Sequence, residues 1–315
     1  MNTKRNFIQT HKIIPFTFRQ NKYDFIVTEL PSADFGDKGT YIILKIKKVF
    51  MTTWELLSYI SEKLNIDEHK IGYAGLKDKN ATTTQYISIP QIKGNIKKIL
   101  DNKQVEILDQ FKSKSKLSIG ELKGNNFKIT LHDVKEENII QIYQMISKIQ
   151  KHGIPNYFGY QRFGEDYDFN KAKDVVYGEE VVTNPKVEHL LISAYQSYFF
   201  NAWLSTRVEL SKEKGLNKLE ILEGDLFFDK DKKVVSGLLP GRKVKRSSSK
   251  AYEIEKEFDD LYVQAKGYRR EAWVKVNNIK NKYNKEEEQL VIEFDLPKGS
   301  YATVVIENIA NANFK

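Results

Sequence analysis

Segments with the pattern of β-strands lie toward both ends of the chain, and a segment of different character separates them. The strand-like runs are rich in β-branched and aromatic residues and are bounded by turn formers: residues 25–30, 41–47, 273–276, 290–294 and 303–306. Between them, helix-like and basic stretches replace the strands. We therefore expect one strand-rich domain, made of residues 1–169 and 266–315, with a smaller domain inserted at residues 170–265.

The charge of the chain indicates the kind of partner to expect. Its formal net charge is +9 and its pI is near 9.2, which indicates a polyanionic partner. Nucleic acid is the commonest such partner, and an anionic membrane surface is the next. No apolar run approaches the ~20 residues of a membrane span, and no signal peptide is evident at the N-terminus. We expect a soluble, cytoplasmic protein.

The residue types that are missing restrict the chemistry. The chain has no cysteine, which excludes disulfides, thiolate catalysis and cysteine-ligated zinc. Its five histidines are scattered, and none forms a His-x-x-x-His pair, so we expect no metal site. Any catalysis must therefore use oxygen and nitrogen side chains.

The most informative short motif is residues 74–85, which place a single carboxylate, Asp78, between Lys77 and Lys79. Two flanking ammonium groups favour the ionised carboxylate, the form that a nucleophile needs. Turn formers surround Asp78 and a strand-like run follows it, so we expect a loop that feeds a strand. A solvated turn without function is the alternative interpretation.

Two further segments have the composition of a nucleic-acid surface. Residues 155–164 contain four aromatic residues, an asparagine amide and an arginine between glycines, which suits stacking of bases. Residues 242–250 carry five positive charges and no acid, which makes them the strongest phosphate-binding candidate. The aromatic residues of the helix predicted at 187–210 have helical spacing, so we expect them in the core.

Taken together, these segments resemble the TruD family of tRNA pseudouridine synthases. The matching blocks follow the same order along nearly the whole chain: residues 74–85, 122–127, 155–164, 193–201 and 296–303. The resemblance implies an α+β pseudouridine synthase fold, with a mixed, largely antiparallel central sheet and a smaller inserted α+β domain. The turn before Thr40 lacks the family's Glu-His, and residues 236–241 follow its Thr-Gly-Pro pattern only loosely.

The resemblance also implies an activity and a set of site residues. The family isomerises uridine 13 of tRNA, and we expect the same of this chain, as a monomer with no cofactor, metal or membrane partner. Asp78 would be the nucleophile, and the target base would flip out and stack on Phe158. The residues at the substrate-contacting positions of the family are Phe25, Asn156, Phe158 and Tyr301. Candidate supporting residues are Lys77, Gln85 and Arg162, with Arg19 as a further candidate cation beside Asp78.

Several alternatives stay open at this point. Asp78 would either attack C1′ of the ribose or remove the C2′ proton to give a glycal. An RNA-binding protein or tRNA chaperone could keep this fold without catalysis. A carboxylate-based hydrolase of sugars or nucleosides would need a second acid near Asp78, and none is evident in the sequence.

Overall fold

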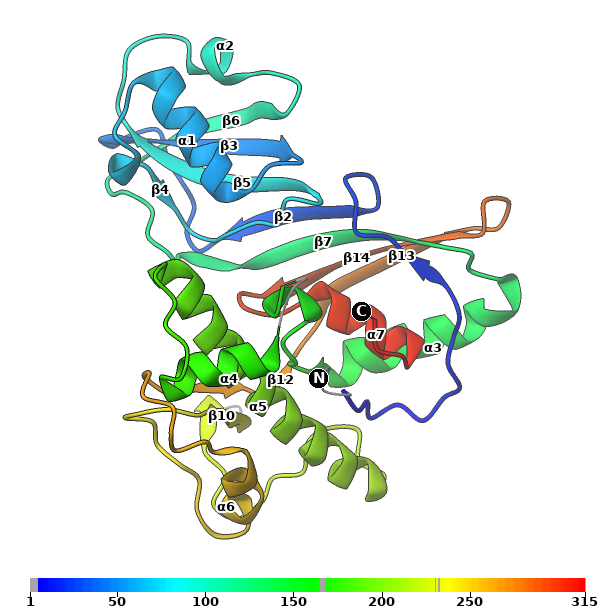
Figure 1. The fold of residues 1–315 in the computed structure, drawn as a ribbon. Coiled ribbons are helices and arrows are strands. Elements are labelled where there is room, and N and C mark those ends of the chain that lie inside the picture. Colours follow the sequence, from blue (N-terminus) through cyan, green and yellow to red (C-terminus); the bar gives the residue numbers. More distant parts are fainter. Residues whose placement is uncertain (1–4, 165–167, 230, 232, 315) are drawn as a thin grey trace. The chain divides into compact units, whose positions relative to one another are not determined.

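The computed structural model describes residues 5–164, 168–229, 231 and 233–314 of the protein, and they form two compact units (Figure 1). Unit 1 is drawn from residues 1–14, 140–276 and 300–315, and unit 2 from residues 15–139 and 277–299. Both units are therefore discontinuous in sequence. The sequence predicted this for the strand-rich domain and not for the other. Their boundaries do not coincide with the predicted insertion at residues 170–265, which remains a prediction.

Unit 2 is built on a sheet of nine described strands in which the order is β13-β14-β7-β2-β5-β3-β6, with β1 added to β7 and β4 to β5. The strands are β1 (Thr17–Phe18), β2 (Phe25–Pro31), β3 (Tyr41–Val49), β4 (Gly72–Tyr73), β5 (Thr82–Pro90), β6 (Val105–Ser113), β7 (Leu122–His132), β13 (Asn277–Asn284) and β14 (Gln289–Pro297). Among these described pairs, β2 and β5 run parallel and the others antiparallel. The sheet is thus mixed and largely antiparallel, as predicted.

Helices α1 (Thr53–Leu64) and α2 (Ile96–Leu100) pack on one face of this sheet, with the short 3-10 helix η1 (Glu68–Lys70) between them in sequence. Thr52 caps α1 in a capping box with Glu55, and Asn65 ends it in the left-handed conformation. Apolar residues of β3, β5 and β6 meet those of both helices in one buried cluster. The spacing of Trp54, Leu57, Ile60 and Leu64 predicts that these residues form the apolar face of α1; Trp54 is exposed, and Leu56 is buried instead.

Unit 1 is mainly helical. Its elements are α3 (Glu136–His152, whose first residues belong to unit 2), β8 (Ile154–Pro155), η2 (Tyr160–Arg162), α4 (Phe169–Tyr177), α5 (Pro185–Glu213), β9 (Phe227–Asp229), β10 (Val234–Leu239), α6 (Ser249–Glu255), η3 (Lys256–Phe258), β11 (Tyr268–Glu271), β12 (Trp273–Val274) and α7 (Ala302–Ala310). On α5, Tyr195, Phe200 and Trp203 are buried, which confirms their predicted place in the core. None of the described helices is long and apolar enough to cross a membrane.

Two strand predictions near the C-terminus were wrong. Residues 303–306 lie in helix α7, not in a strand. Every residue of α7 is buried, so its apolar run shows no helical periodicity and cannot be distinguished from a buried strand by pattern. Of residues 273–276, expected to join the large sheet, only Trp273 and Val274 form a strand, and that strand pairs with β8 in unit 1.

Candidate active site

Asp78 lies on the loop that enters strand β5, as the sequence predicted. Because β2 and β5 are parallel, with Ile26 opposite Thr82, their first residues meet at one edge of the sheet. The Thr82 hydroxyl donates a hydrogen bond of 2.7 Å to the carbonyl of Lys22, just before β2 begins. The Asp78 loop and the start of β2 are therefore neighbours at this edge.

Lys77 anchors the Asp78 loop from inside the protein. Its Nζ lies 2.6 Å from the Glu29 carboxylate, and the side chains of both residues are almost completely buried. The backbone N–H of Lys77 also donates to the hydroxyl of Thr53, the first residue of α1, at 2.9 Å. A buried ion pair of this kind holds its partners firmly, because breaking it leaves an isolated buried charge. The loop is thereby fixed to β2 and to α1.

Lys79, the other flanking lysine, points to helix α1. Its Nζ lies 2.9 Å from the Glu55 carboxylate, and both side chains are about half exposed. The backbone N–H of Thr52, then Lys79, lower the pKa of Glu55 to about 2. Lys79 therefore holds the far side of the loop, and its charge is neutralised by Glu55.

A cation from strand β3 lies against the Asp78 loop, although the sequence had not suggested it. Lys48 is 1% exposed, and its Nζ donates to the backbone carbonyl of Met51 and, at the long distance of 3.5 Å, to that of Asp78. Burial lowers the pKa of Lys48 to about 8, against the opposing effect of the Asp78 charge. An ammonium group is thus held at the point where β3, the start of α1 and the Asp78 loop meet.

The carboxyl of Asp78 is in a more demanding environment than the sequence suggested. The residue is accessible to water, yet desolvation by the protein around it raises its pKa, and this outweighs the charges of Lys48 and Lys77, which lower it. Lys48 and Lys77 therefore stabilise the ionised carboxylate, but desolvation has the larger effect and the pKa of Asp78 stays raised.

Gln85 and Phe25 are both buried in unit 2. The Gln85 side chain accepts a hydrogen bond from the Thr53 hydroxyl at 3.1 Å, and its Nε2 has no partner among the described residues. Gln85 thus supports Thr53, which in turn holds the Lys77 backbone. The Phe25 ring is 2% exposed and packs on Phe18 and Phe127. A contact of Phe25 with substrate remains a prediction.

In unit 1, Asn156 is held by hydrogen bonds that use both ends of its side-chain amide. Its Oδ1 accepts from the Arg270 guanidinium at 2.8 Å, and its Nδ2 donates to the carbonyl of Glu271 at 2.9 Å. The backbone carbonyl of Asn156 accepts a second bond from Arg270, at 3.1 Å. These contacts fix the start of the aromatic segment to strand β11.

The ring of Phe158 lies in a cage of aromatic and basic side chains. The Cζ of Arg270 is 3.9 Å from the ring centroid and that of Arg162 is 5.3 Å from it. Phe200 and Tyr301 make edge contacts with the same ring. Asn201, buried on α5, bonds to both the N–H and the carbonyl of Phe158 at 2.9 Å. Phe158 itself is 6% exposed. The structure therefore brings two other predicted residues, Tyr301 and Arg162, against its ring.

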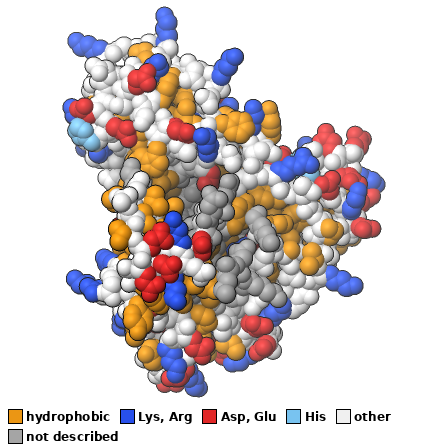
Figure 2. Space-filling model, viewed as in Figure 1, with side chains coloured by type: hydrophobic (Ala, Val, Ile, Leu, Met, Phe, Trp, Pro, Cys, Tyr) orange, Lys and Arg blue, Asp and Glu red, His pale blue; other side chains and the backbone are white. Residues whose placement is uncertain are grey.

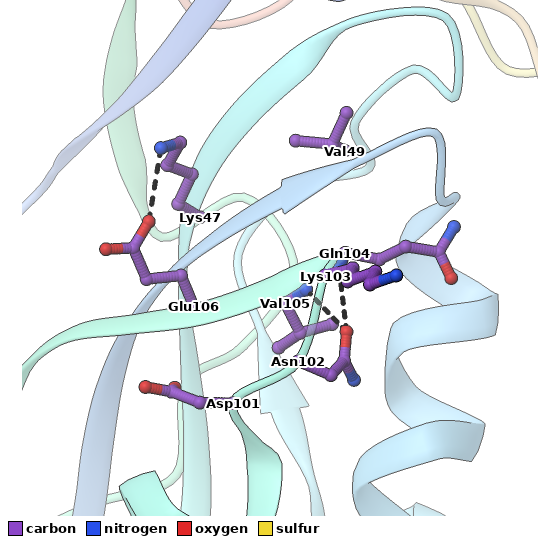
Figure 3. Close-up of a pocket in the computed structure, with 8 residues that line it drawn as sticks. All are labelled: Lys47, Val49, Asp101, Asn102, Lys103, Gln104, Val105 and Glu106. Atoms are coloured by element: carbon purple, nitrogen blue, oxygen red, sulfur yellow. Dashed lines mark hydrogen bonds and ion pairs between the residues drawn. The ribbon is translucent and has the colours of Figure 1, made fainter.

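A surface pocket on unit 2 lies away from these residues. It encloses about 150 Å³ and is lined by Lys47, Val49 and residues 101–106 (Figure 3). Lys47 and Lys48 point to opposite faces of β3 because side chains alternate along a strand. Lys47 lines the pocket and Lys48 does not, and none of the predicted site residues lines it. Over the described chain, no group of His, Asp or Glu is arranged to hold a metal ion.

Sequence reasoning missed Lys48 and Arg270. Leu44, Ile46 and Lys48 share the face of β3 beneath α1, so a lysine stands where the alternation calls for an apolar residue. That break in the pattern was a usable signal. Arg270 carried no such signal, since it is one of two adjacent arginines on a short strand that the sequence did not predict.

Comparison with known proteins gives consistent results. The family model described as tRNA pseudouridine synthase D (TruD) matches residues 3–179 and 169–309. The tRNA pseudouridine synthase D of Wolinella succinogenes is 37% identical, with 99% of each chain aligned. The protein of that name from Sulfurimonas denitrificans is also 37% identical, over 97% of this chain and 98% of its own.

A solved structure shares the fold. The crystal structure of the Methanosarcina mazei protein that carries the name tRNA pseudouridine synthase D superposes with a TM-score of 0.70 at 23% sequence identity. The match covers 98% of this chain and 96% of that one. It confirms the predicted α+β fold class.

Proposed function

Because the chain belongs to the tRNA pseudouridine synthase D family, we propose that it isomerises uridine 13 of tRNA to pseudouridine, with Asp78 as the nucleophile. The observation that carries the proposal is the Asp78 loop, which matches the family's motif and is fixed on both sides by Lys77 and Lys79. We further propose that the protein acts as a monomer in the cytoplasm, without a cofactor or metal.

The reaction makes limited chemical demands. The N1–C1′ bond breaks, the uracil turns, and a new bond joins C5 to C1′; the proton that leaves C5 is replaced by one at N1. Substrate and product are isomers, so no electron, phosphate or external energy is needed. Asp78 acts either by attack on C1′ or by removal of the C2′ proton, and its carboxylate must be ionised for both.

The target base has to leave its stack, which costs a few kcal/mol. In the proposal, the aromatic and basic side chains around Phe158 offset this cost. Arg270 covers one face of the Phe158 ring, and bases stack on guanidinium planes as well as on aromatic rings. The flipped uracil would therefore stack on Phe158 or on the guanidinium that covers it, with Tyr301 beside them.

Asn156 has a narrower role in the proposal than reading the uracil edge. Both ends of its amide are engaged by Arg270 and Glu271. Its contribution is to hold Arg270 and the aromatic segment in place. Phe25, buried against Phe18 and Phe127, would shape the start of β2 beside the Asp78 loop.

Asp78→Asn tests the proposal. The variant keeps the size of the side chain and removes the nucleophile, so release of tritium from tRNA labelled at uridine C5 should fall below about one hundredth of the wild-type rate. Binding of tRNA should be unchanged within about twofold. A wild-type protein that binds tRNA without releasing tritium would support the noncatalytic alternative, and free uracil among the products would support the hydrolase.

A further inference from the structure

Lys48 is a buried cation that contacts the loop of the proposed nucleophile, and its contacts connect three elements. It leaves strand β3 on the face that α1 covers, opposite Thr83 of β5. Its Nζ reaches the carbonyl of Met51, at the turn from β3 to α1, and the carbonyl of Asp78 itself. These contacts fix the backbone position of Asp78 relative to the sheet.

Burial of a lysine at this position needs a reason. A buried ammonium costs free energy unless it is paired, and a hydrophobic side chain would satisfy the alternation of Leu44 and Ile46 without that cost. The charged groups that act on Lys48 are Asp78 and Glu55, which favour its protonated form, and Lys77, which opposes it. Glu55 already pairs with Lys79, and Lys77 pairs with Glu29. Among the described residues Lys48 has no ion-paired carboxylate of its own, and its ammonium is held by the backbone carbonyls of Met51 and Asp78.

We propose that Lys48 is the positioning residue of the nucleophile: its buried ammonium ties the backbone of Asp78 to the start of α1 and places a positive charge beside the loop that carries the carboxylate. The inference rests on the proposed function of Asp78. Lys48 differs from Lys77 and Lys79, which each pair with a carboxylate of their own, because its ammonium contacts the backbone carbonyl of Asp78.

The decisive variant is Lys48→Met, with Lys47→Met as the matched control on the opposite, partly exposed face of the same strand. Methionine keeps the length and removes the charge. We expect Lys48→Met to lower turnover about 100-fold through misplacement of the nucleophile. The variant removes one of the two cations that lower the pKa of Asp78, so that pKa should rise. As the pH is lowered, the variant should therefore lose activity at a higher pH than the wild-type protein does. Lys47→Met should leave both unchanged.

Lys48→Gln keeps a hydrogen-bond donor for Met51 without the charge, and it serves where Lys48→Met does not fold. A titration of the Asp78 side-chain carbon by NMR, assigned with Asp78→Asn, provides a readout independent of activity. In the wild-type protein this signal should respond a second time near pH 8, where Lys48 loses its proton. The proposal is overturned if neither charge-neutral variant moves the titration of Asp78. A titration that moves in a protein without synthase activity would retain the Lys48 inference and refute the proposed function.

Discussion

The guanidinium of Arg270 lies over the ring of Phe158, with its Cζ atom 3.9 Å from the ring centroid. Desolvation lowers the pKa of Arg270 to about 10, so the group stays protonated at neutral pH. The same guanidinium makes two hydrogen bonds to Asn156. Phe158 and Asn156 are thus linked through an arginine that the sequence did not single out, and Tyr301 makes an edge contact with the Phe158 ring.

Phe158→Leu should separate the aromatic character of Phe158 from its contribution to packing. A ring this buried cannot be reduced to alanine without a cavity, and Phe158→Ala should lower the free energy of unfolding by about 3–5 kcal/mol. Leucine fills much of the space and should cost less than about 1.5 kcal/mol. Because leucine offers no stacking face, we expect a loss of turnover of at least about tenfold. Phe294→Leu, at a fully buried position in the sheet of unit 2, is the control that should cost similar stability and spare turnover.

The two lysines that flank Asp78 should differ sharply in their effect on stability. Lys77→Met leaves the Glu29 carboxylate buried and unpaired, so the free energy of unfolding should fall by about 3–5 kcal/mol. Lys79→Met removes an exposed pair with Glu55 and should cost less than about 1 kcal/mol. Urea unfolding measures both. The double variant Lys77→Met with Glu29→Met should recover most of the loss; equal effects of the two single variants would contradict the role of Lys77 as the inner anchor.

Arg242, Lys243 and Lys245 should carry a large share of the electrostatic attraction for RNA. All three are exposed, and no described carboxylate lies within ion-pair distance of them, whereas Arg246 pairs with Asp259 at 2.5 Å. A plot of the logarithm of the RNA-binding constant against the logarithm of the salt concentration has a negative slope. Replacing the three residues with glutamine should make that slope smaller in magnitude by about 2–3.

A matched control is the replacement of three exposed lysines of unit 2, Lys93, Lys98 and Lys103, with glutamine. It removes the same net charge. On the face drawn in Figure 2, basic and acidic side chains are intermingled, so net charge alone does not identify the RNA-binding surface. An identical change of slope in both triple variants would indicate a general effect of charge and not a binding site.

The parts of the fold that could be predicted are those with local patterns. Strands β2, β3 and β14 of unit 2 and the loop before β5 follow from periodicity and turn chemistry, whereas the polar strand β13 was not predicted. Helix α7 could not be predicted in this way, because a helix buried on every side has the same composition as a buried strand. Its conformation is decided by the tertiary structure around it.

The candidate site was predictable to a similar extent. The position of Asp78 followed from its motif, but the partners of its neighbouring lysines did not. Lys77 pairs with Glu29 and Lys79 with Glu55, both distant in sequence. Lys48, whose ammonium contacts the backbone carbonyl of Asp78, comes from the strand that pairs with β5. Such pairings depend on which strands lie side by side, and a single sequence does not report strand order.

The two compact units share one more property, which concerns biosynthesis. Strand β14 completes the sheet of unit 2 by pairing with β7, and helix α7 supplies a fully buried element of unit 1. Unit 2 therefore cannot close its sheet before β14, which ends at Pro297, has been made, and unit 1 cannot close its core before α7, which ends at Ala310. A nascent or prematurely terminated chain would therefore leave apolar surfaces of both units uncovered, as substrates for chaperones and proteases.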